Sequence, residues 1–234
     1  MSILETSIGQ IMREISGSKR VFQHYAVDCK DEQKTLKQAI EKGQLNQTKV
    51  TSLLAKLQVH WVPKGYWLQA NDSEVITYIL IRSHQVHRVQ LAQLIRLAQY
   101  VEALNDTHPL CPHGLTEYLI HLQQTLEQHM QKEENILFPM LESGQGHLAL
   151  GPIDVMRAGH EEHIESIQTL DVLTHAFTLP KDEVPLKDSV QEWRSLYLGI
   201  AILKEDLQQH IDIENNILFA RYSVSLEDGY ASVL

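Results

Sequence analysis

The sequence has few cysteines, few basic residues and no long apolar run, and each shortage excludes a class of protein. Its two cysteines, Cys29 and Cys111, are too few for a disulfide framework, which favours the reducing cytoplasm. The net charge is −10, so we expect no nucleic-acid partner, because proteins that bind nucleic acids usually carry a basic face. No apolar run approaches the roughly 18 residues of a membrane span. The N-terminus also lacks the pattern of a secretion signal.

Strand signals are scarce as well, and the apolar residues instead recur at steps of three and four. This period predicts an all-α protein. We expect a small helical N-terminal domain over residues 1–60, a linker over 61–72 that contains Pro63 and Gly65, and a loose polar tail over 223–234. The helices expected in the N-terminal domain cover 7–15, 19–24, 32–42 and 46–57.

The region between linker and tail, residues 73–222, is expected to form four long helices. Asn71 and Asp72 are candidates to cap the first helix, and Pro152 suits the first turn of the third. Short connections between long helices predict an antiparallel four-helix bundle. The four expected helices cover approximately residues 73–104, 115–141, 152–177 and 186–221.

Histidine is abundant, with 13 residues, and two of them open a repeat. The segment "HMQKEENILFP" begins at His129, and "HIDIENNILFA" begins at His210. A His and a Glu four residues apart share one helix face, with their Cβ atoms about 5–6 Å apart. The repeat pairs Glu133 with Glu214. Glu134 is therefore expected to rotate away into solvent, and the Ile-Leu-Phe tails of both segments are expected to pack in the core.

The first and third long helices also resemble each other. "SHQVH" carries His84 and His87, and "GHEEH" carries His160 and His163. The order of motifs predicts two helical hairpins related by a pseudo-twofold axis. At a rise of about 1.5 Å per residue, one imidazole from each helix reaches a common level (His84, His129, His160 and His210). We expect His87 and His163 to support these ligands or to be solvated, and His121 to have a packing or hydrogen-bonding role.

Two glutamates inside such a bundle need compensation, because an unpaired buried carboxylate costs several kcal/mol. Shared cations provide it. Nitrogen and oxygen donors without thiolates suit non-haem iron, manganese or zinc. Glu133 and Glu214 are predicted to bridge two ions, with two imidazoles on each ion. An oxo or hydroxo bridge then still leaves room for a small exogenous ligand.

These motifs resemble the repair-of-iron-centres (RIC) family of di-iron proteins, which have a hemerythrin-like bundle after a small helical domain. The most specific segments are "HMQKEENILFPM", "GPIDVMRAGHEEH" and "HIDIENNILF". The resemblance implies two non-haem irons with His84, His129, His160 and His210 as terminal ligands and Glu133 and Glu214 as bridges. The family's N-terminal domain usually carries a Cys-Cys pair, whereas "VDCKDEQKTL" has Cys29 alone.

The resemblance also implies a function in nitrosative and oxidative stress. Family members repair damaged iron–sulfur proteins, by donating iron or by reducing NO to nitrous oxide with electrons from an external donor, which the sequence does not identify. Alternatives are a carrier or sensor of O2 or NO without turnover, and a structural zinc bundle. Whether the N-terminal domain mediates a homodimer stays open.

Overall fold

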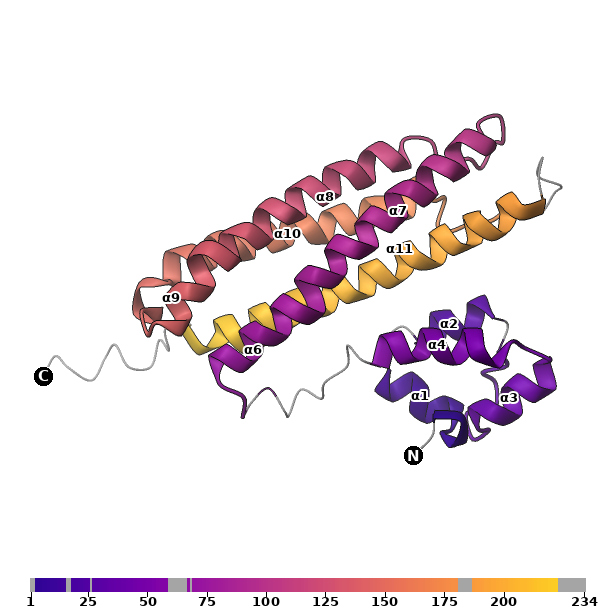
Figure 1. Ribbon diagram of the computed structural model, residues 1–234, viewed down its shortest axis with the longest axis horizontal. Helices are drawn as coiled ribbons and strands as arrows, with labels where there is room; N and C mark the ends of the chain where they lie inside the picture. The colour runs from indigo at the N-terminus through magenta and orange to yellow at the C-terminus, as the bar shows by residue number, and fades with distance from the viewer. Residues whose placement is uncertain are drawn as a thin grey trace, which may run out of the picture.

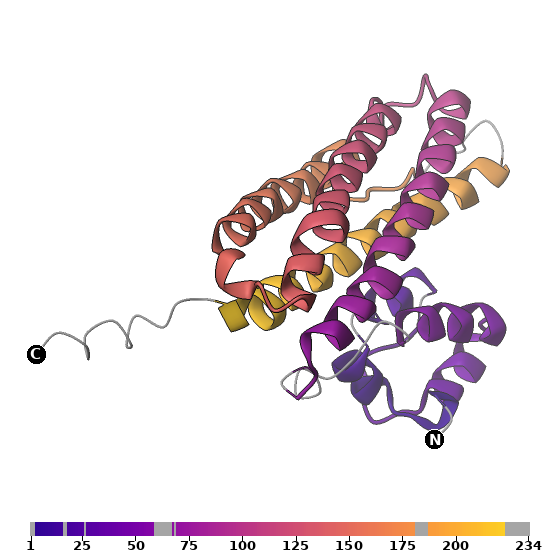
Figure 2. The ribbon, with the colours of Figure 1, turned by 60° about the vertical axis from the view of Figure 1, so that its left-hand side comes forward.

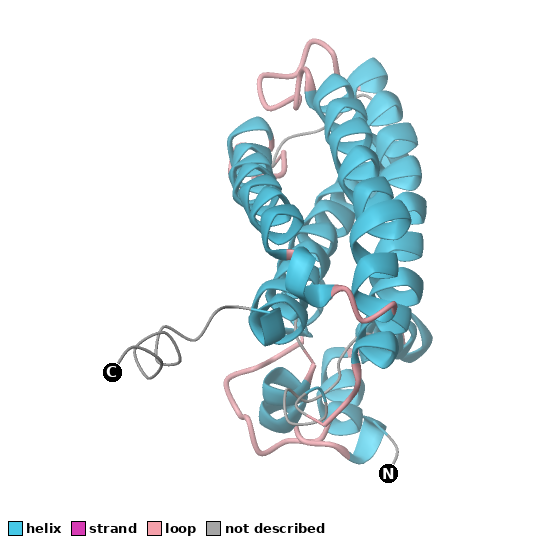
Figure 3. Cartoon of the chain, turned by 90° about the vertical axis from the view of Figure 1, so that its left-hand side faces the viewer, coloured by secondary structure: helices cyan, strands magenta, loops and turns pink. Residues whose placement is uncertain are grey.

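The computed structural model describes residues 3–15, 18–25, 27–58, 67, 69–180 and 187–222. All regular elements in these ranges are helices, which confirms the predicted all-α class (Figure 1, Figure 3). Most of the expected linker and the expected tail 223–234 lie outside the described residues. No helix within the described ranges is long and apolar enough to cross a membrane.

The N-terminal helices form a small unit of their own. They enclose an apolar core that includes Ile8, Phe22, Leu36 and Leu54. Helix α2 of this unit contacts α11 of the bundle, where Ile202 packs against the same core (Figure 2). The helices are α1 (Ile8–Glu14), α2 (Ser18–His24), α3 (Leu36–Gly43) and α4 (Gln47–Gln58).

Helix α3 begins four residues later than the sequence predicts. Thr35 is the N-cap of this helix and forms a capping box. Its side chain accepts from the backbone N–H of Gln38, and the Gln38 side chain accepts from the N–H of Thr35. This reciprocal pair satisfies two backbone donors that a helix start leaves free. The predicted start at residue 32 was wrong because residues 32–35 form a turn and the cap instead of a helix.

Four helical rods lie side by side in the rest of the chain (Figure 1, Figure 2). Contacts between α7 and α8, α8 and α10, α10 and α11, and α11 and α7 close them into the predicted antiparallel bundle. The first rod is α6 (Asp72–Tyr78), the π-helical turn η2 (Ile79–His84) and α7 (Gln85–Leu104), and the second is α8 (Leu115–Lys132), the π-helical turn η3 (Glu133–Leu137) and α9 (Phe138–Glu142). The third rod is α10 (Leu150–Leu173). The fourth is α11 (Lys187–Ile213), the π-helical turn η5 (Glu214–Leu218) and the short helix η6 (Phe219–Tyr222).

The end of α10 differs from the prediction. The helix stops at Leu173 instead of Phe177, because His175, Ala176 and Phe177 have φ values of 48°, 53° and 59°. Residues in this left-handed region cannot continue a right-handed helix. The hydroxyl of Thr174 accepts from the backbone N–H of Phe177 at 3.3 Å and so holds the reversed turn.

Two apolar layers divide the interior of the bundle along its length. One layer lies toward the α9 end and includes Ile79, Phe138, Met156 and Leu218. The other fills the remaining length and includes Leu91, Leu126, Ile167 and Leu207. On the first and third rods, the buried histidines fall between the residues of these two layers, and on the second and fourth rods Glu133 and Glu214 do, while His129 and His210 lie within the last turn of the second layer. The packing therefore places a polar layer between two apolar ones.

Candidate metal centre

The polar layer brings together all six residues that the sequence predicts as metal ligands. The Nε2 atoms of His84 and His129 lie 3.4 and 3.1 Å from the carboxylate oxygens of Glu133. The Nε2 atoms of His160 and His210 lie 3.0 and 2.9 Å from those of Glu214. None of the six residues is more than 6% exposed.

The ligand atoms fall into two groups that share both carboxylates. One group holds His84 and His210 and the other holds His129 and His160, each with Glu133 and Glu214. Within each group, the candidate ligand atoms lie within 4.8 Å of one another. Two centres that share two carboxylates have the arrangement of a carboxylate-bridged di-metal site in a helical bundle.

The ligand atoms converge, and most of them lack a hydrogen-bond partner, although Nε2 of His210 and Oε1 of Glu214 are hydrogen-bonded at 2.9 Å. The Nε2 atoms of His84, His129 and His160 and both oxygens of Glu133 are buried and have no hydrogen-bond partner among the described residues. Buried polar atoms are almost always satisfied, and a cation satisfies all of these at once. The donors are nitrogen and oxygen only, which fits non-haem iron.

Electrostatics point to ionised carboxylates. Burial and the neighbouring Glu214 raise the pKa of Glu133, but the imidazoles of His129 and His84 outweigh both and leave this pKa below its ordinary value. Glu214 is similar: burial raises its pKa, and His210 and His160 lower it well below the ordinary range. Both groups therefore carry the negative charge that a metal bridge requires.

Three of the four rods contain a wide π-helical turn beside a ligand. The backbone N–H groups of Gln85, Phe138 and Phe219 bond to carbonyls five residues earlier, those of Leu80, Glu133 and Glu214. Such turns occur frequently at functional sites. They were not predicted, because a hydrophobic period of three and four residues does not reveal a single wide turn.

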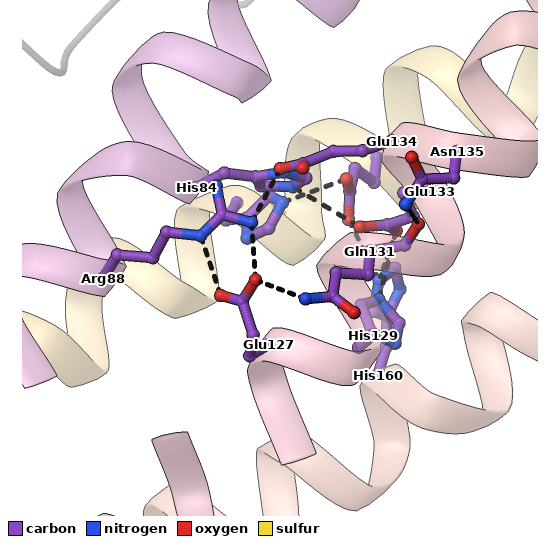
Figure 4. A network of polar contacts seen from close by, with 11 residues as sticks. His84, Arg88, Glu127, His129, Gln131, Glu133, Glu134, Asn135 and His160 are labelled. Atoms are coloured by element: carbon purple, nitrogen blue, oxygen red, sulfur yellow. Dashed lines mark hydrogen bonds and ion pairs between the residues drawn. The ribbon is translucent and has the colours of Figure 1, made fainter. Parts of the chain in front are cut away.

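The π turn η3 explains why the expectation for Glu134 was wrong. A wide turn rotates successive side chains by less than an α-helix does. Glu134 accordingly reaches across to the end of η2 while its side chain stays 27% exposed, and its Oε1 accepts from the Nδ1–H of His84 at 2.7 Å (Figure 4). The corresponding residue of the second hairpin, Asn215, accepts from the Nδ1–H of His160 at 2.9 Å. Each partner fixes the tautomer that leaves Nε2 free for a metal.

A cluster of charged residues supports the first of these hydrogen bonds (Figure 4). Arg88 lies 3.0 Å from the same Glu134 oxygen and forms two hydrogen bonds with Glu127, of 2.7 and 3.0 Å. Gln131 donates to Glu127 at 3.0 Å. The carboxylate of Glu134, which is hydrogen-bonded to His84, is therefore held by a guanidinium, whereas the partner of His160 is the neutral amide of Asn215.

The phenylalanines of the two repeats pack against the site. Phe138 stacks on the ring of His84 and Phe219 on that of His160, both at 5.9 Å between centroids. The predicted core packing holds for most of the Ile-Leu-Phe residues, but Ile136 is 54% exposed. The two tails are thus equivalent at Phe and Leu and differ at Ile.

Comparison with known proteins agrees with this geometry. Residues 75–222 match the family described as hemerythrin HHE cation binding domain. The chain is 39% identical over 222 residues to the iron-sulfur cluster repair protein YtfE of Dickeya chrysanthemi (strain Ech1591), covering 94% of this chain and 98% of the relative. It is 36% identical over 222 residues to YtfE of Escherichia coli O81 (strain ED1a), with coverage of 94% and 98%.

This chain belongs to the hemerythrin-like YtfE family. The family resemblance predicted from the sequence is therefore confirmed.

The additional histidines of the site are buried and not solvated. His87 and His163 are 0% and 4% exposed, with ring centroids 5.3 Å from His210 and 5.0 Å from His129. Burial and the adjacent His210 hold the pKa of His87 well below its ordinary value. Burial lowers the pKa of His163 to about 4. By contrast, the side chain of His121 is exposed, so it does not pack in the core.

Two further features of the site were not found by sequence reasoning. A Cβ atom on Gly159 would lie 2.7 Å from His129 Nδ1, so the ring of His129 rests on bare helix backbone. His210 has no partner for its Nδ1 among the described residues and lines a cavity of about 10 Å³, about the size of one water molecule.

The comparison of "EEN" with "ENN" in the repeat was the one available signal for Glu134 and Asn215.

Proposed function

We propose that this protein repairs damaged iron–sulfur clusters with a pair of non-haem iron ions bound between the two apolar layers. His84 and His210 would hold one ion, and His129 and His160 the other. Glu133 and Glu214 would bridge them together with an oxo or hydroxo group. The observation that carries the proposal is that two groups of four buried ligand atoms share both glutamates. The relatives' name, iron-sulfur cluster repair protein, gives the class of client.

The residues of this chain would bind the ions, orient the ligands and exclude water. Glu134 and Asn215 hold the imidazoles of His84 and His160 in the ligating tautomer. The apolar layers raise the strength of each charge interaction by keeping water out. Four neutral imidazoles and two carboxylates supply two negative charges and a hydroxo bridge would add a third, so the charge of two ferrous ions would be only partly neutralised. Such a site suits ions that are bound and later released.

When bound, the ions could be donated as iron to a damaged cluster. Alternatively, they would provide two adjacent positions at which NO is reduced to nitrous oxide. Of these two modes we favour iron donation. Two ferrous ions could supply the two electrons for one nitrous oxide, but repeated reduction of NO needs electrons from outside, and Cys29 alone cannot provide them as a dithiol. We further propose that residues 1–60 and 73–222 act as separate domains, and that the protein works in the cytoplasm, where its clients would be found.

Iron analysis of the purified protein tests the site. We expect about two irons per chain, with a large loss in a His129→Ala, His210→Ala double variant. Glu142→Gln is the matched control, because Glu142 is an exposed carboxylate that contacts Ser73 instead of the site. A protein with tightly bound zinc and no near-ultraviolet absorption of an oxo-bridged diferric centre would overturn the proposal.

Cluster repair is tested with the iron-loaded protein and a [4Fe–4S] dehydratase inactivated by NO. We expect the dehydratase to regain activity while labelled iron moves from this protein into the cluster. The Glu142→Gln variant should act like the parent, and the double variant should not. A stable nitrosyl without recovery of the dehydratase would support a sensor. Nitrous oxide over several turnovers without iron transfer would support NO reduction.

A further inference from the structure

His87 lies beside the candidate metal centre but is absent from both ligand groups. Its Nδ1 lies 3.2 Å from Oε1 of Gln90. Because a side-chain amide oxygen only accepts, Nδ1 must carry the proton of this hydrogen bond. The Nε2 atom of His87 is buried and has no partner among the described residues.

The orientation of Gln90 is fixed in turn by Asp206. The amide Nε2 of Gln90 donates to Oδ2 of Asp206, an acidic residue on α11 one turn before His210. A carboxylate cannot donate in its ionised form, so the amide nitrogen must face Asp206 and the amide oxygen must face His87. The three residues form a relay that sets the tautomer of His87, as Glu134 does for His84.

The relay leaves His87 with an unused lone pair on Nε2. Gln90 occupies Nδ1, so Nε2 is the ring nitrogen that is left to meet a group of the metal centre. The ring centroid of His87 lies 5.3 Å from that of His210. A buried acceptor without a donor is rare in proteins, and a donor bound in the metal centre is the one that this position can meet.

The second hairpin lacks the relay. Residues 166 and 125 occupy the positions that correspond to Gln90 and Asp206. They are Ser166 and Thr125, whose hydroxyls donate to the backbone carbonyls of Glu162 and Leu122. His163 is buried like His87, but the described hydrogen bonds do not set its tautomer. Nε2 of His163 is also without a partner among the described residues, so the two halves differ in whether a side-chain relay fixes the tautomer of the buried histidine.

We propose that His87 contacts the exogenous ligand of the cation held by His84 and His210, accepting a hydrogen bond at Nε2 from water or hydroxide bound there. The inference rests on the proposed di-metal function. It makes His87 a specificity-determining residue: this half favours ligands that carry a hydrogen over ligands that present lone pairs alone. Azide, which presents lone pairs, is the probe for this discrimination.

The tautomer is tested first, in zinc-loaded protein, by nitrogen-15 NMR of the histidine rings. We expect His87 to be protonated at Nδ1 and bare at Nε2. Gln90→Leu should abolish this preference. Asp206→Asn should keep it, because the asparagine oxygen still accepts from Gln90. A proton on Nε2 of His87 in the parent protein would overturn the proposal.

The ligand contact is tested by azide titration of the diferric protein, followed by its charge-transfer absorbance. Loss of a hydrogen bond to bound water should raise azide affinity about fivefold in His87→Leu. Gln90→Leu, which leaves His87 in place, should give a similar rise, and Asp206→Asn little change. Unchanged azide affinity in His87→Leu and Gln90→Leu would sink the proposal. Absence of two irons in the parent would instead contradict the proposed function.

Discussion

The Nδ1–H of His84 donates to Oε1 of Glu134, 2.7 Å away, although the two residues lie 50 positions apart on different helices. The residue that directly follows a predicted bridging carboxylate thus orients a ligand of the neighbouring rod. His160 and Asn215 repeat the relationship with an amide in place of the carboxylate.

Replacing the carboxylate behind His84 should weaken metal binding without removing a ligand. We expect Glu134→Gln to lower iron affinity about 10- to 100-fold, the usual effect of losing such a partner. The glutamine retains the shape but lowers the basicity of His84 and loses the charge that pairs with Arg88. Competition with a chelator measures the affinity, and Glu142→Gln is the control. Equal affinities in both variants would contradict the prediction.

Neutralising a shared carboxylate should affect both ions at once. Glu133 and Glu214 each belong to both ligand groups, so Glu133→Gln should reduce iron from about two per chain to well below one. His84→Ala, which removes a ligand of one group, should retain more. Iron is counted per folded chain, with circular dichroism to establish that the helices persist. Loss of a single iron in Glu133→Gln would speak against a bridging role.

A methyl group at Gly159 should displace His129. A Cβ there would lie 2.7 Å from Nδ1 and 3.1 Å from Cε1 of that ring, and the ring cannot shift without moving Nε2 from the ligand group. We expect Gly159→Ala to lower iron content despite the higher helix propensity of alanine. Gly151→Ala on the same helix is the matched control, because a Cβ there meets no atom within 4 Å. Full iron content in Gly159→Ala would refute the argument.

Both thiols should react slowly at neutral pH. Burial and Glu102 raise the pKa of Cys111 to about 11, and burial and Asp28 raise that of Cys29 above its ordinary value. A raised pKa leaves little thiolate, the reactive form, so alkylation should accelerate about tenfold per pH unit. Mass spectrometry of iodoacetamide-treated protein between pH 7 and pH 9 measures each site. A plateau for Cys29 below pH 8 would reveal a reactive thiolate.

The sequence was sufficient to predict the bundle and the convergence of the six site residues, because both depend on regular helix geometry. A His and a Glu four residues apart share a face whatever surrounds them. The roles of Glu134, Gln90 and Asp206 could not be predicted, because they depend on π turns and on contacts between rods. The end of α10 was missed for a related reason: nothing in "THAF" marks three residues in left-handed backbone.

The two apolar layers also determine how iron reaches the centre. With hydrocarbon packed above and below the polar layer, a hydrated ion cannot travel along the bundle axis. Entry and release must occur sideways, between neighbouring rods. Of the six site residues His129 is the most exposed, at 6%, and Gly159 on α10 has no side chain to cover its ring. If the proposed iron donation holds, this flank between α8 and α10 is where we expect a client protein to receive it.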